Sequence, residues 1–406
     1  MRIAPPLLLV LALATVARAE APAPAFDRVV IDDDFPNAYQ VEVVDVDGDL
    51  KLDVVALGGD VCAWYQNPSW TKRVITNAQT APKVISSAAA DLDGDGKAEI
   101  AIAYDFEMND PKRGKLLLAR QGAGVGEPWK LLPVADVGSI HRLRWGDLDG
   151  DGHLDLIVAP IFGPDAAPPV YDDPARIFAY TKVDALVTGL WKRVDLASRR
   201  VTHAIEFHPE FPGVHDPSLL AANNSGVTLI EPPTAPGAER ARDLLPGAEG
   251  PAPKRGASEI HLGRSHGGRL FLATLEPWHG TDVVVWPLEG SKFGPRQVID
   301  DTLDDGHALW VVDLDSDGQD EILAGCRGKD HRVVLYRFDD ASKTWKPTVV
   351  DSDVAAQDLR GGDLDGDGRP DVAAVGGATH NVVLYLQRRT SRADRGGIGN
   401  RRPAPR

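Results

Sequence analysis

The sequence predicts an all-β fold: a seven-bladed β-propeller of four-stranded blades, closed by an N-terminal strand. Three observations lead to this prediction. An acidic nine-residue motif recurs five times, short strand-like segments flank each copy, and the chain returns to the same pattern along nearly its whole length. The repeat period of about 46–58 residues is in the range of propeller blades, each of which is four short strands.

The acidic motif keeps one spacing in all five copies. Carboxylates occupy positions 1, 3, 5 and 9, and a glycine stands at position 4 or 6. Two carboxylates about 4–5 Å apart repel each other by roughly 3–4 kcal/mol at an effective dielectric near 20, so four in one loop favour a bound cation. Calcium takes six to eight hard oxygen ligands and suits a glycine-turned loop of this kind. The alternative is a set of solvated acidic turns.

We therefore expect up to five structural calcium sites. Their carboxylate ligands are Asp45, Asp47, Asp49 and Asp53; Asp91, Asp93, Asp95 and Glu99; Asp147, Asp149, Asp151 and Asp155; Asp313, Asp315, Asp317 and Glu321; and Asp363, Asp365, Asp367 and Asp371. The residue at position 7 varies freely, which fits a ligand that contributes only its backbone carbonyl.

The strands are predicted from alternating apolar segments. "HALWVVD" precedes one acidic loop, and "EILAGC", "RVVLYRFD" and "TWKPTVVD" follow it, so a blade has four strands with the loop between the first two. In chain order the seven predicted blades are 39–75, 84–134, 139–196, 201–246, 257–300, 306–351 and 355–387. In the fourth and fifth blades "HPEFPGVHD" and "GRSHGG" replace the acidic loop.

The last blade lacks a fourth strand at its C-terminal end. "FDRVVIDD" near the N-terminus is similar to the fourth strands "TKRVIT", "PRQVIDD" and "KPTVVD". We expect it to complete the last blade and to close the ring, which removes the open edge of the sheet.

The two ends of the chain look different from the repeats. Arg2, the apolar run "LLLVLALATV" and Ala17-Arg18-Ala19 predict a signal peptide over 1–19, with a propeller over 20–387. The basic, Gly/Pro-rich stretch 388–406 predicts a disordered tail. The apolar run is too short to span a bilayer, and no later segment qualifies, so a secreted or periplasmic protein is expected.

Composition narrows the partners. The net charge of -16 argues against nucleic acid, because phosphate binding needs a basic face. The two cysteines, Cys62 and Cys326, do not make a disulfide scaffold and either pair or stay free. Trp64, Trp70 and Trp286 fall in the predicted blade frameworks, where core packing is the expected role rather than sugar stacking.

The motif "DxDGDGxxD" and its strand flanks resemble the FG-GAP or VCBS repeat family of calcium-binding seven-bladed propellers. That resemblance implies the fold and the calcium. A narrower resemblance rests on "WYQNP", "GASEIHLG", "ATLEPWHGTDVVVW" and "DDGHALWVVDLDSDGQDEILAGCRG", which are similar to the propeller domain of aldos-2-ulose dehydratase. It implies removal of water from a keto-sugar such as 1,5-anhydrofructose, with a divalent metal in the propeller.

Histidines recur at one position of the predicted blades. His141 and His307 each precede the first aspartate of an acidic loop by six residues, and His203 starts the matching strand of the fourth blade. The first strand of a blade lines the channel and ends at the acidic loop, so these imidazoles are expected at the channel mouth on the opposite face. Tyr39 and Gln357 take the same position in the first and last blades.

Neighbouring loops are expected to add further groups at that mouth. Glu259 lies near the same position in the fifth blade, and loops between second and third strands supply His279, His331 and His380. Converging neutral imidazoles and a carboxylate can bind a divalent metal such as Mg²⁺ or Zn²⁺, or supply a general base. The alternative is that these polar groups only hold ordered water.

We assign roles in a sugar dehydration on this basis. His141, His203 and His307 are expected to be metal ligands or the base, and Glu259, Glu276 and His279 to be ligands or the acid. Arg327 is expected to orient the substrate. The first hypothesis is thus a lyase or dehydratase acting on a small sugar. The alternatives are a non-catalytic carbohydrate- or protein-binding propeller, and a polysaccharide lyase acting on a glycan.

Overall fold

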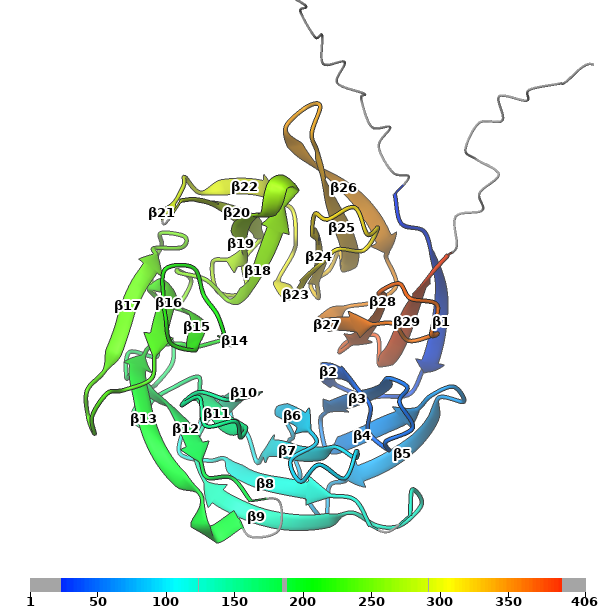
Figure 1. Cartoon of the computed structure of the whole chain (residues 1–406), viewed down its shortest axis with the longest axis vertical. Coiled ribbons are helices and arrows are strands. Elements are labelled where there is room, and N and C mark those ends of the chain that lie inside the picture. The colour runs from blue at the N-terminus through cyan, green and yellow to red at the C-terminus, as the bar shows by residue number, and fades with distance from the viewer. Residues whose placement is uncertain (1–22, 123, 185–187, 291, 389–406) are drawn as a thin grey trace, which may run out of the picture.

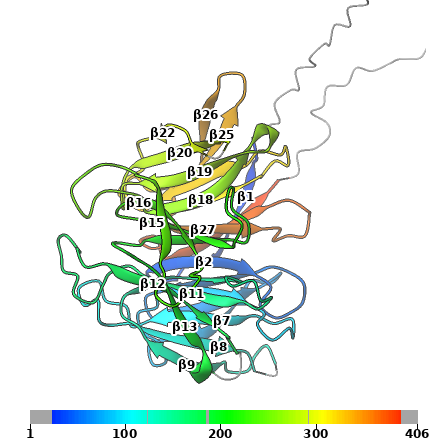
Figure 2. The ribbon, with the colours of Figure 1, turned by 60° about the vertical axis from the view of Figure 1, so that its left-hand side comes forward.

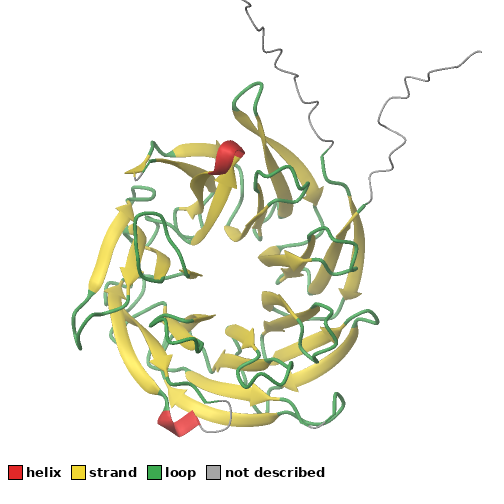
Figure 3. Cartoon of the chain, viewed as in Figure 1, coloured by secondary structure: helices red, strands yellow, loops and turns green. Residues whose placement is uncertain are grey.

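The computed structural model describes residues 23–122, 124–184, 188–290 and 292–388, and these form a ring of seven antiparallel sheets around a central axis (Figure 1). This confirms the predicted all-β, seven-bladed propeller. The only helical segments in the described ranges are two short 3-10 turns, η1 (Thr188–Leu190) and η2 (His266–Gly268) (Figure 3). No helix in these ranges is long and apolar enough to cross a membrane.

Each blade is a meander whose first strand lies nearest the axis. Blades 1 to 3 consist of β2 (Ala38–Val44), β3 (Asp53–Gly58), β4 (Val61–Gln66) and β5 (Thr71–Thr76); β6 (Ser86–Ala90), β7 (Glu99–Tyr104), β8 (Lys115–Arg120) and β9 (Lys130–Asp136); and β10 (Ile140–Gly146), β11 (Asp155–Pro160), β12 (Ala175–Thr181) and β13 (Lys192–Arg199). The predicted blade bounds agree with these to within a few residues.

Blades 4 to 7 continue the pattern. They consist of β14 (Ala204–His208), β15 (Ser218–Asn223), β16 (Gly226–Glu231) and β17 (Arg240–Leu245); β18 (Glu259–Ser265), β19 (Arg269–Glu276), β20 (Asp282–Glu289), the short β21 (Lys292–Phe293) and β22 (Gln297–Asp300); β23 (Gly306–Val312), β24 (Glu321–Cys326), β25 (Arg332–Asp339) and β26 (Thr344–Asp351); and β27 (Ala356–Gly362), β28 (Asp371–Gly376) and β29 (Asn381–Gln387).

The N-terminal strand β1 (Phe26–Asp32) closes the ring. It pairs antiparallel with β29 and becomes the fourth strand of blade 7, as predicted. Figure 2 shows the blue β1 beside the red end of the chain. The predicted signal peptide lies outside the described residues, as does the predicted tail apart from Arg388, whose amide donates to the carbonyl of Ala25.

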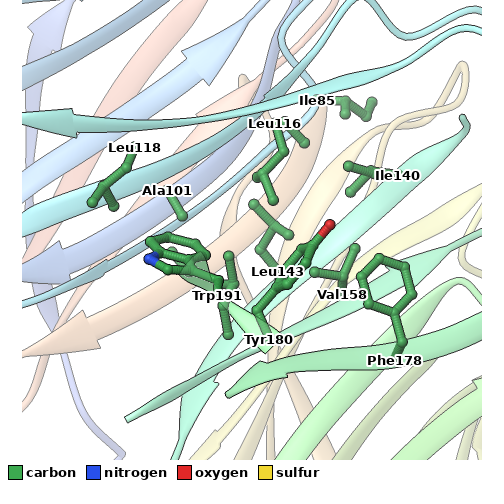
Figure 4. Close-up of a cluster of buried hydrophobic side chains, with 13 residues drawn as sticks. Ile85, Ala101, Leu116, Leu118, Ile140, Leu143, Val158, Phe178, Tyr180 and Trp191 are labelled. Carbon is green, nitrogen blue, oxygen red and sulfur yellow. The ribbon is translucent and has the colours of Figure 1, made fainter. Parts of the chain in front are cut away.

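Apolar side chains hold neighbouring blades together. Each of the seven blade junctions has its own cluster of buried residues. Between blades 2 and 3, for example, Leu116 and Leu118 pack with Phe178, Tyr180 and Trp191 (Figure 4). Burying one such side chain stabilises the fold by roughly 1.5–3 kcal/mol, so each junction cluster adds substantially to the stability of the ring.

The three tryptophans pack in the blades, as expected. Trp64 and Trp286 are buried in junction clusters, and Trp70 packs half-buried against another. Cys62 and Cys326 are both buried and free, so of the two expectations for the cysteines the unpaired one is correct.

A polar contact recurs at three junctions. The hydroxyls of Tyr65, Tyr336 and Tyr385, all on third strands, donate to aspartates at the ends of the preceding blades' fourth strands. The pairs are Tyr65 with Asp32 (2.5 Å), Tyr336 with Asp300 (2.7 Å) and Tyr385 with Asp351 (2.8 Å).

The first strands give the ring two distinct faces. In blade 3, His141 lies at the start of β10, whereas Asp147 follows its last residue, Gly146. We call the face where first strands begin the mouth face, and the face where they end, at the acidic motifs, the loop face. The fold therefore places the histidines and the acidic loops on opposite faces, as predicted.

Candidate functional site

The mouth-face position of the first strand is a β-bulge in four blades. The strand register shifts at Tyr39, His141, His307 and Gln357, so each of these residues is left out of the pairing with the second strand. A bulge bends its strand and re-aims the extra side chain, and bulges are common next to active sites. Here the bulges belong to strands that surround the central axis (Figure 1).

Hydrogen bonds between blades orient three of the imidazoles. Nδ1 of His141 lies 2.9 Å from the carbonyl oxygen of His203, Nδ1 of His203 lies 3.1 Å from that of Ser258, and Nδ1 of His307 lies 2.6 Å from that of Gln357. Each contact reaches the next blade around the ring. A carbonyl oxygen only accepts, so Nδ1 carries the proton and Nε2 keeps its lone pair in all three rings.

The three imidazoles are brought close together with Tyr39. Ring centroids are 4.5 Å apart for His141 and His203, and 4.9 Å apart for His203 and His307. The Tyr39 hydroxyl lies 2.7 Å from Nε2 of His141 and 3.3 Å from Nε2 of His307. The predicted convergence of His141, His203 and His307 is therefore present, and Tyr39 stands between two of them.

A fourth imidazole comes from the turn between β19 and β20. His279 has a φ of 50°, in the left-handed region that non-glycine residues rarely adopt, and its Nε2 lies 3.0 Å from Nε2 of His203. Arg327 donates to Nδ1 of His279 at 3.0 Å. His203, His279 and His307 each offer a ring nitrogen, and these three atoms lie within 4.8 Å of one another.

Arg327 is held at the outer edge of this cluster. Its guanidinium also donates to Asp305 Oδ2 at 3.0 Å and to Gln357 Oε1 at 2.8 Å. The side chains of His279 and Arg327 are 18% and 19% exposed, whereas His203 and His307 are buried. A ligand at the mouth would therefore meet His279 and Arg327 first.

Burial keeps these imidazoles neutral. It lowers the pKa of His141, His279 and His307 well below the usual value, and nearby positive charges on Arg142 and Arg327 lower it further. The pKa of His203 is also lowered by burial. Burial raises the pKa of the Tyr39 hydroxyl, which therefore stays protonated. Neutral imidazoles are the form that binds metals or accepts a proton.

Glu259 is an ionised group beneath the cluster. Its Oε1 lies 3.2 Å from Arg142 and 3.0 Å from Nδ1 of His203. Burial alone would raise its pKa, but the charge of Arg142 and the hydrogen bond from His203 outweigh that effect and lower the pKa to about 2. A carboxylate that stays ionised orients His203 and is unsuited to donate a proton, so of the two roles expected for Glu259 the acid role loses support.

Aromatic rings form one wall of the mouth. Phe162 and Tyr171 stack with ring centroids 4.2 Å apart, and Trp278 packs on both of them and on His279. These rings belong to a cluster built mainly by the 161–171 segment between β11 and β12. They are buried, so they offer no exposed platform for a sugar. Sequence reasoning missed this wall, because the segment that builds it has no counterpart in the repeat.

The structure does not bring every predicted residue into this site. Glu276 is fully buried inside blade 5, where its carboxylate accepts hydrogen bonds from Thr274, Trp286 and Arg296. Its prediction as ligand or acid is wrong, because its side chain points into the blade rather than toward the imidazoles. The cluster also lacks His331 and His380. Arg142 and Asp305 also belong to the site. In the sequence they could have been found from their positions, because Arg142 follows His141 and Asp305 stands two residues before His307.

The acidic loops gather their carboxylates on the loop face. In at least four of them the carboxylates at positions 1, 3 and 9 lie within 4.8 Å of one another, as in the set Asp45, Asp47 and Asp53. The position-9 carboxylate accepts from the amide that follows position 1 in every loop, for example from Val46 to Asp53 at 2.9 Å.

The donor chemistry of these loops fits a cation. Buried oxygens on Asp47 and Asp315 have no hydrogen-bond partner among the described residues. Burial, with neighbouring carboxylates adding to it, raises the pKa of Asp53 to about 7 and of Glu321 to about 8. Carboxyl groups that are so disfavoured as anions are what a hard divalent cation stabilises.

Comparison with known proteins supports the repeats. The FG-GAP-like repeat family matches residues 45–102 and 313–374, and the FG-GAP repeat matches residues 84–124, so this chain carries FG-GAP repeats. No curated protein matches the chain.

Two solved structures share the propeller fold. The exotype rhamnogalacturonan lyase YesX superposes with a TM-score of 0.50 and 14% identity, over 90% of this chain and 74% of that chain. The extracellular domain of the one-component system BT4673 from B. thetaiotaomicron gives a TM-score of 0.51 and 9% identity, over 89% of this chain and 39% of that chain. At these identities the likeness concerns the fold alone.

Proposed function

We propose that this chain is an exported, calcium-stabilised lyase that eliminates water from a keto-sugar at the mouth-face histidine cluster. The observation that carries the proposal is the set of neutral imidazoles whose Nε2 lone pairs converge beside Tyr39 and Arg327. The substrate class follows the resemblance of blades 1, 5 and 6 to the propeller domain of aldos-2-ulose dehydratase. Export follows the predicted signal peptide.

The cluster offers one place for a divalent metal. His203 and His307 would hold it through Nε2, and His279 would join them once it gives up the hydrogen bond that its Nδ1 accepts from Arg327. The three ring nitrogens lie within 4.8 Å of one another, and imidazole suits zinc and similar ions. A divalent cation there would polarise a substrate carbonyl and so make the neighbouring C–H more acidic. Arg327 lies close enough to His279 to hold the same oxygen.

His141 and Tyr39 then remain for proton transfer. Nε2 of neutral His141 accepts the proton from the carbon next to the carbonyl, and the Tyr39 hydroxyl gives its proton to the departing hydroxyl, which leaves as water. The 2.7 Å contact between the two groups lets the proton on His141 return to Tyr39, which restores both for the next turnover. Glu259 is a positioning residue that holds His203.

Calcium belongs to the same proposal as a structural element. The five acidic loops would each bind one ion through the carboxylates at positions 1, 3, 5 and 9, on the face away from the imidazoles. Calcium there would hold the first two strands of a blade together and would take no part in the elimination.

The test is to incubate the purified protein with 1,5-anhydrofructose and with 3-keto sugars and to follow the absorbance of the enone product, with and without a chelator. His141→Ala and Tyr39→Phe should each lower kcat by roughly 10²–10⁴-fold, the usual contribution of a general acid or base. His331→Ala, on the same face but outside the cluster, should leave kcat unchanged.

The other outcomes distinguish the alternatives. Wild-type protein that forms no enone from any keto-sugar after metal is restored contradicts the dehydratase. Release of unsaturated oligosaccharides from a uronate polysaccharide would instead identify a polysaccharide lyase. Sugar or protein binding without turnover would identify a binding propeller.

A further inference from the structure

A cleft of about 650 Å³ lies against the acidic loop of blade 3. Its walls include Asp149 and Asp155 of that loop, Arg176 and Lys192 of the outer strands, and the proline-rich turn 232–237 of blade 4. Asp149 and Asp155 are positions 3 and 9 of the motif, so the cleft opens directly onto the carboxylates that would hold the cation.

Blade 3 differs from the other four acidic loops at position 9. Asp155 is 2% exposed, its Oδ2 accepts from the amide of Leu148 at 2.9 Å, and its Oδ1 has no partner among the described residues. In blades 1 and 7 the second oxygen accepts a hydrogen bond, from the amide of Asn67 (2.8 Å) and from the amide of Gln387 (2.7 Å). In blades 2 and 6 a guanidinium approaches it only to ion-pair distance, with Arg120 Nε at 3.4 Å and Arg337 Nε at 4.0 Å. Blade 3 has neither an amide nor a guanidinium at this oxygen.

At position 3, blade 3 differs from blades 1, 2 and 6, whereas blade 7 resembles it, because the strand register places Leu386, which has no donor in its side chain, at the corresponding point. The last residues of β4 and β8, Gln66 and Arg120, and the corresponding Arg337 of β25 donate to the position-3 aspartates of blades 1, 2 and 6. The strand register places Thr181 at the same point of blade 3, because Tyr180 pairs with Leu156 as Ala119 pairs with Ile100. The Thr181 hydroxyl instead donates to the carbonyl of Lys192, at 3.5 Å.

Blade 2 provides the internal contrast. A cleft of about 410 Å³ lies at the equivalent place, lined by Glu99, Arg120 and Lys130. There the Arg120 guanidinium contacts both Asp93 and Glu99 and stands between the loop and the cleft. Blade 3 has the smaller threonine at this point, so its carboxylates face the cleft directly.

We propose that the calcium ion of blade 3 keeps coordination positions open to this cleft and binds an acidic saccharide there through the sugar's carboxylate and hydroxyl oxygens. Calcium takes six to eight oxygens in flexible geometry, so a loop with unoccupied positions accepts oxygens from a ligand. The site is separate from the mouth-face cluster, and it rests on the proposed calcium occupancy of the loops.

The walls of the cleft define the ligand class. Arg193 and Asp195 also line the cleft, and they form an ion pair with each other. Arg176 and Lys192 are exposed and have no ion-pair partner within the described part of the chain, so with a cation on the loop carboxylates they favour a negatively charged ligand. Pro232, Pro233 and Pro236 give the opposite wall an apolar surface against which a sugar ring can pack. The volume is within the range of small-molecule sites and accommodates a disaccharide. A uronate disaccharide satisfies all three features.

The experiment is calorimetric titration of the full chain with digalacturonate, in calcium and in chelator, with the neutral galactobiose as the control sugar. We expect binding of digalacturonate only in calcium, and at least tenfold weaker binding of galactobiose. Thr181→Arg, which copies the arrangement of blade 2, should abolish binding. Lys192→Ala should weaken it about tenfold, whereas Lys130→Ala, the matched change in blade 2, should leave it unchanged.

Calcium stoichiometry and the melting temperature are measured on every variant, so that loss of folding is recognised. If the chain binds calcium but not digalacturonate, the inference is wrong and the calcium proposal stands. If Thr181→Arg binds digalacturonate as wild type does, the site lies elsewhere and the inference is also wrong. If no calcium binds, this inference and the calcium proposal fail together, while the enone assay at the mouth still decides the lyase.

Discussion

At the scale of single residues, the mouth-face site depends on which ring nitrogen carries the proton. Backbone carbonyl oxygens of neighbouring blades accept hydrogen bonds from Nδ1–H of His141, His203 and His307. All three Nε2 atoms therefore keep their lone pairs. Such outer contacts fix the tautomer and the orientation of a histidine that binds metal or takes up protons. The backbone of the ring thus does at this site what a second layer of side chains does in many enzymes.

The buried pair of Glu259 and Arg142 allows a stability prediction at this scale. Both side chains are 5% exposed, so Glu259→Gln leaves the Arg142 charge uncompensated in the interior. Removing one partner of a buried ion pair costs about 3–5 kcal/mol, and we expect a loss of this size in urea unfolding. Combining it with Arg142→Met should restore part of the loss. Glu239→Gln, at the exposed pair with Arg199, should cost less than 1 kcal/mol.

A Glu259→Gln protein that is as stable as wild type would contradict this account of the pair. The comparison with the double variant separates the charge from the packing, because only an unpaired charge is relieved when its partner is also removed.

At the scale of the element, each blade with an acidic loop has its own proposed cation site between the first two strands. The carboxylates of one loop approach within 4.8 Å, so their repulsion opposes folding until a cation is bound. Blades 4 and 5 have lost the motif, and in blade 4 the ion pair of Arg240 with Asp216 lies at the end of the segment that replaces it.

Calcium removal should therefore destabilise the protein strongly. A ligand present at 100 times its Kd stabilises the folded state by about 2.7 kcal/mol per site, so five sites should raise the melting temperature by roughly 10 °C or more. We expect a chelator to remove this increment in a thermal melt. Asp371→Asn should reduce the response, whereas Asp216→Asn, in a blade without the motif, should leave it unchanged. An identical melting curve with and without chelator would exclude the calcium sites.

At the scale of the whole molecule, the ring is closed by pairing the two ends of the described chain. Asp351 lies at the point of closure, where its Oδ2 accepts from Arg28 of β1 at 2.7 Å and from Tyr385 of β29 at 2.8 Å. It therefore joins blade 6 to both outer strands of blade 7. Closure removes the free edges that an open sheet of this size would present.

Asp351 should make this closure sensitive to acid. Burial would raise its pKa, but the hydrogen bonds and charge of Arg28 and the bond from Tyr385 lower it below the usual value. A carboxyl group with a lowered pKa stabilises the fold above its unfolded pKa of about 3.9 and loses that contribution as pH falls through the folded value. Asp351→Asn should cost about 1–3 kcal/mol at pH 7. The difference from wild type should begin to shrink below about pH 4 and should vanish only below the lowered pKa of the folded state.

Urea unfolding from pH 3 to pH 7 measures this difference. Asp27→Asn serves as the control, because Asp27 and Arg388 form an exposed pair in the same region, for which we expect almost no effect. A difference between Asp351→Asn and wild type that persists unchanged at pH 3 would show that the carboxylate is not what holds the closure.

The sequence by itself determined the seven blades, the closing strand and the position of the histidines. These follow from local and periodic signals: strand alternation has a period of two, the acidic motif has one spacing, and His141 and His307 stand at the same distance from it. A repeat fold transmits such signals directly, because each unit has the same local geometry. Glu276, unlike His141 and His307, does not stand at a fixed distance from an acidic motif. Its assignment to the site was wrong.

Only the tertiary structure decided which of these groups meet, and how. The bulges at Tyr39 and His141, the bond from Arg327 to His279, and the open oxygen of Asp155 all arise where separate blades or strands come together. Spacing along the chain specifies the end of the strand at which a residue lies. The direction of its side chain depends on bulges, turns and neighbouring blades, and these are set by packing between segments that are distant in the sequence.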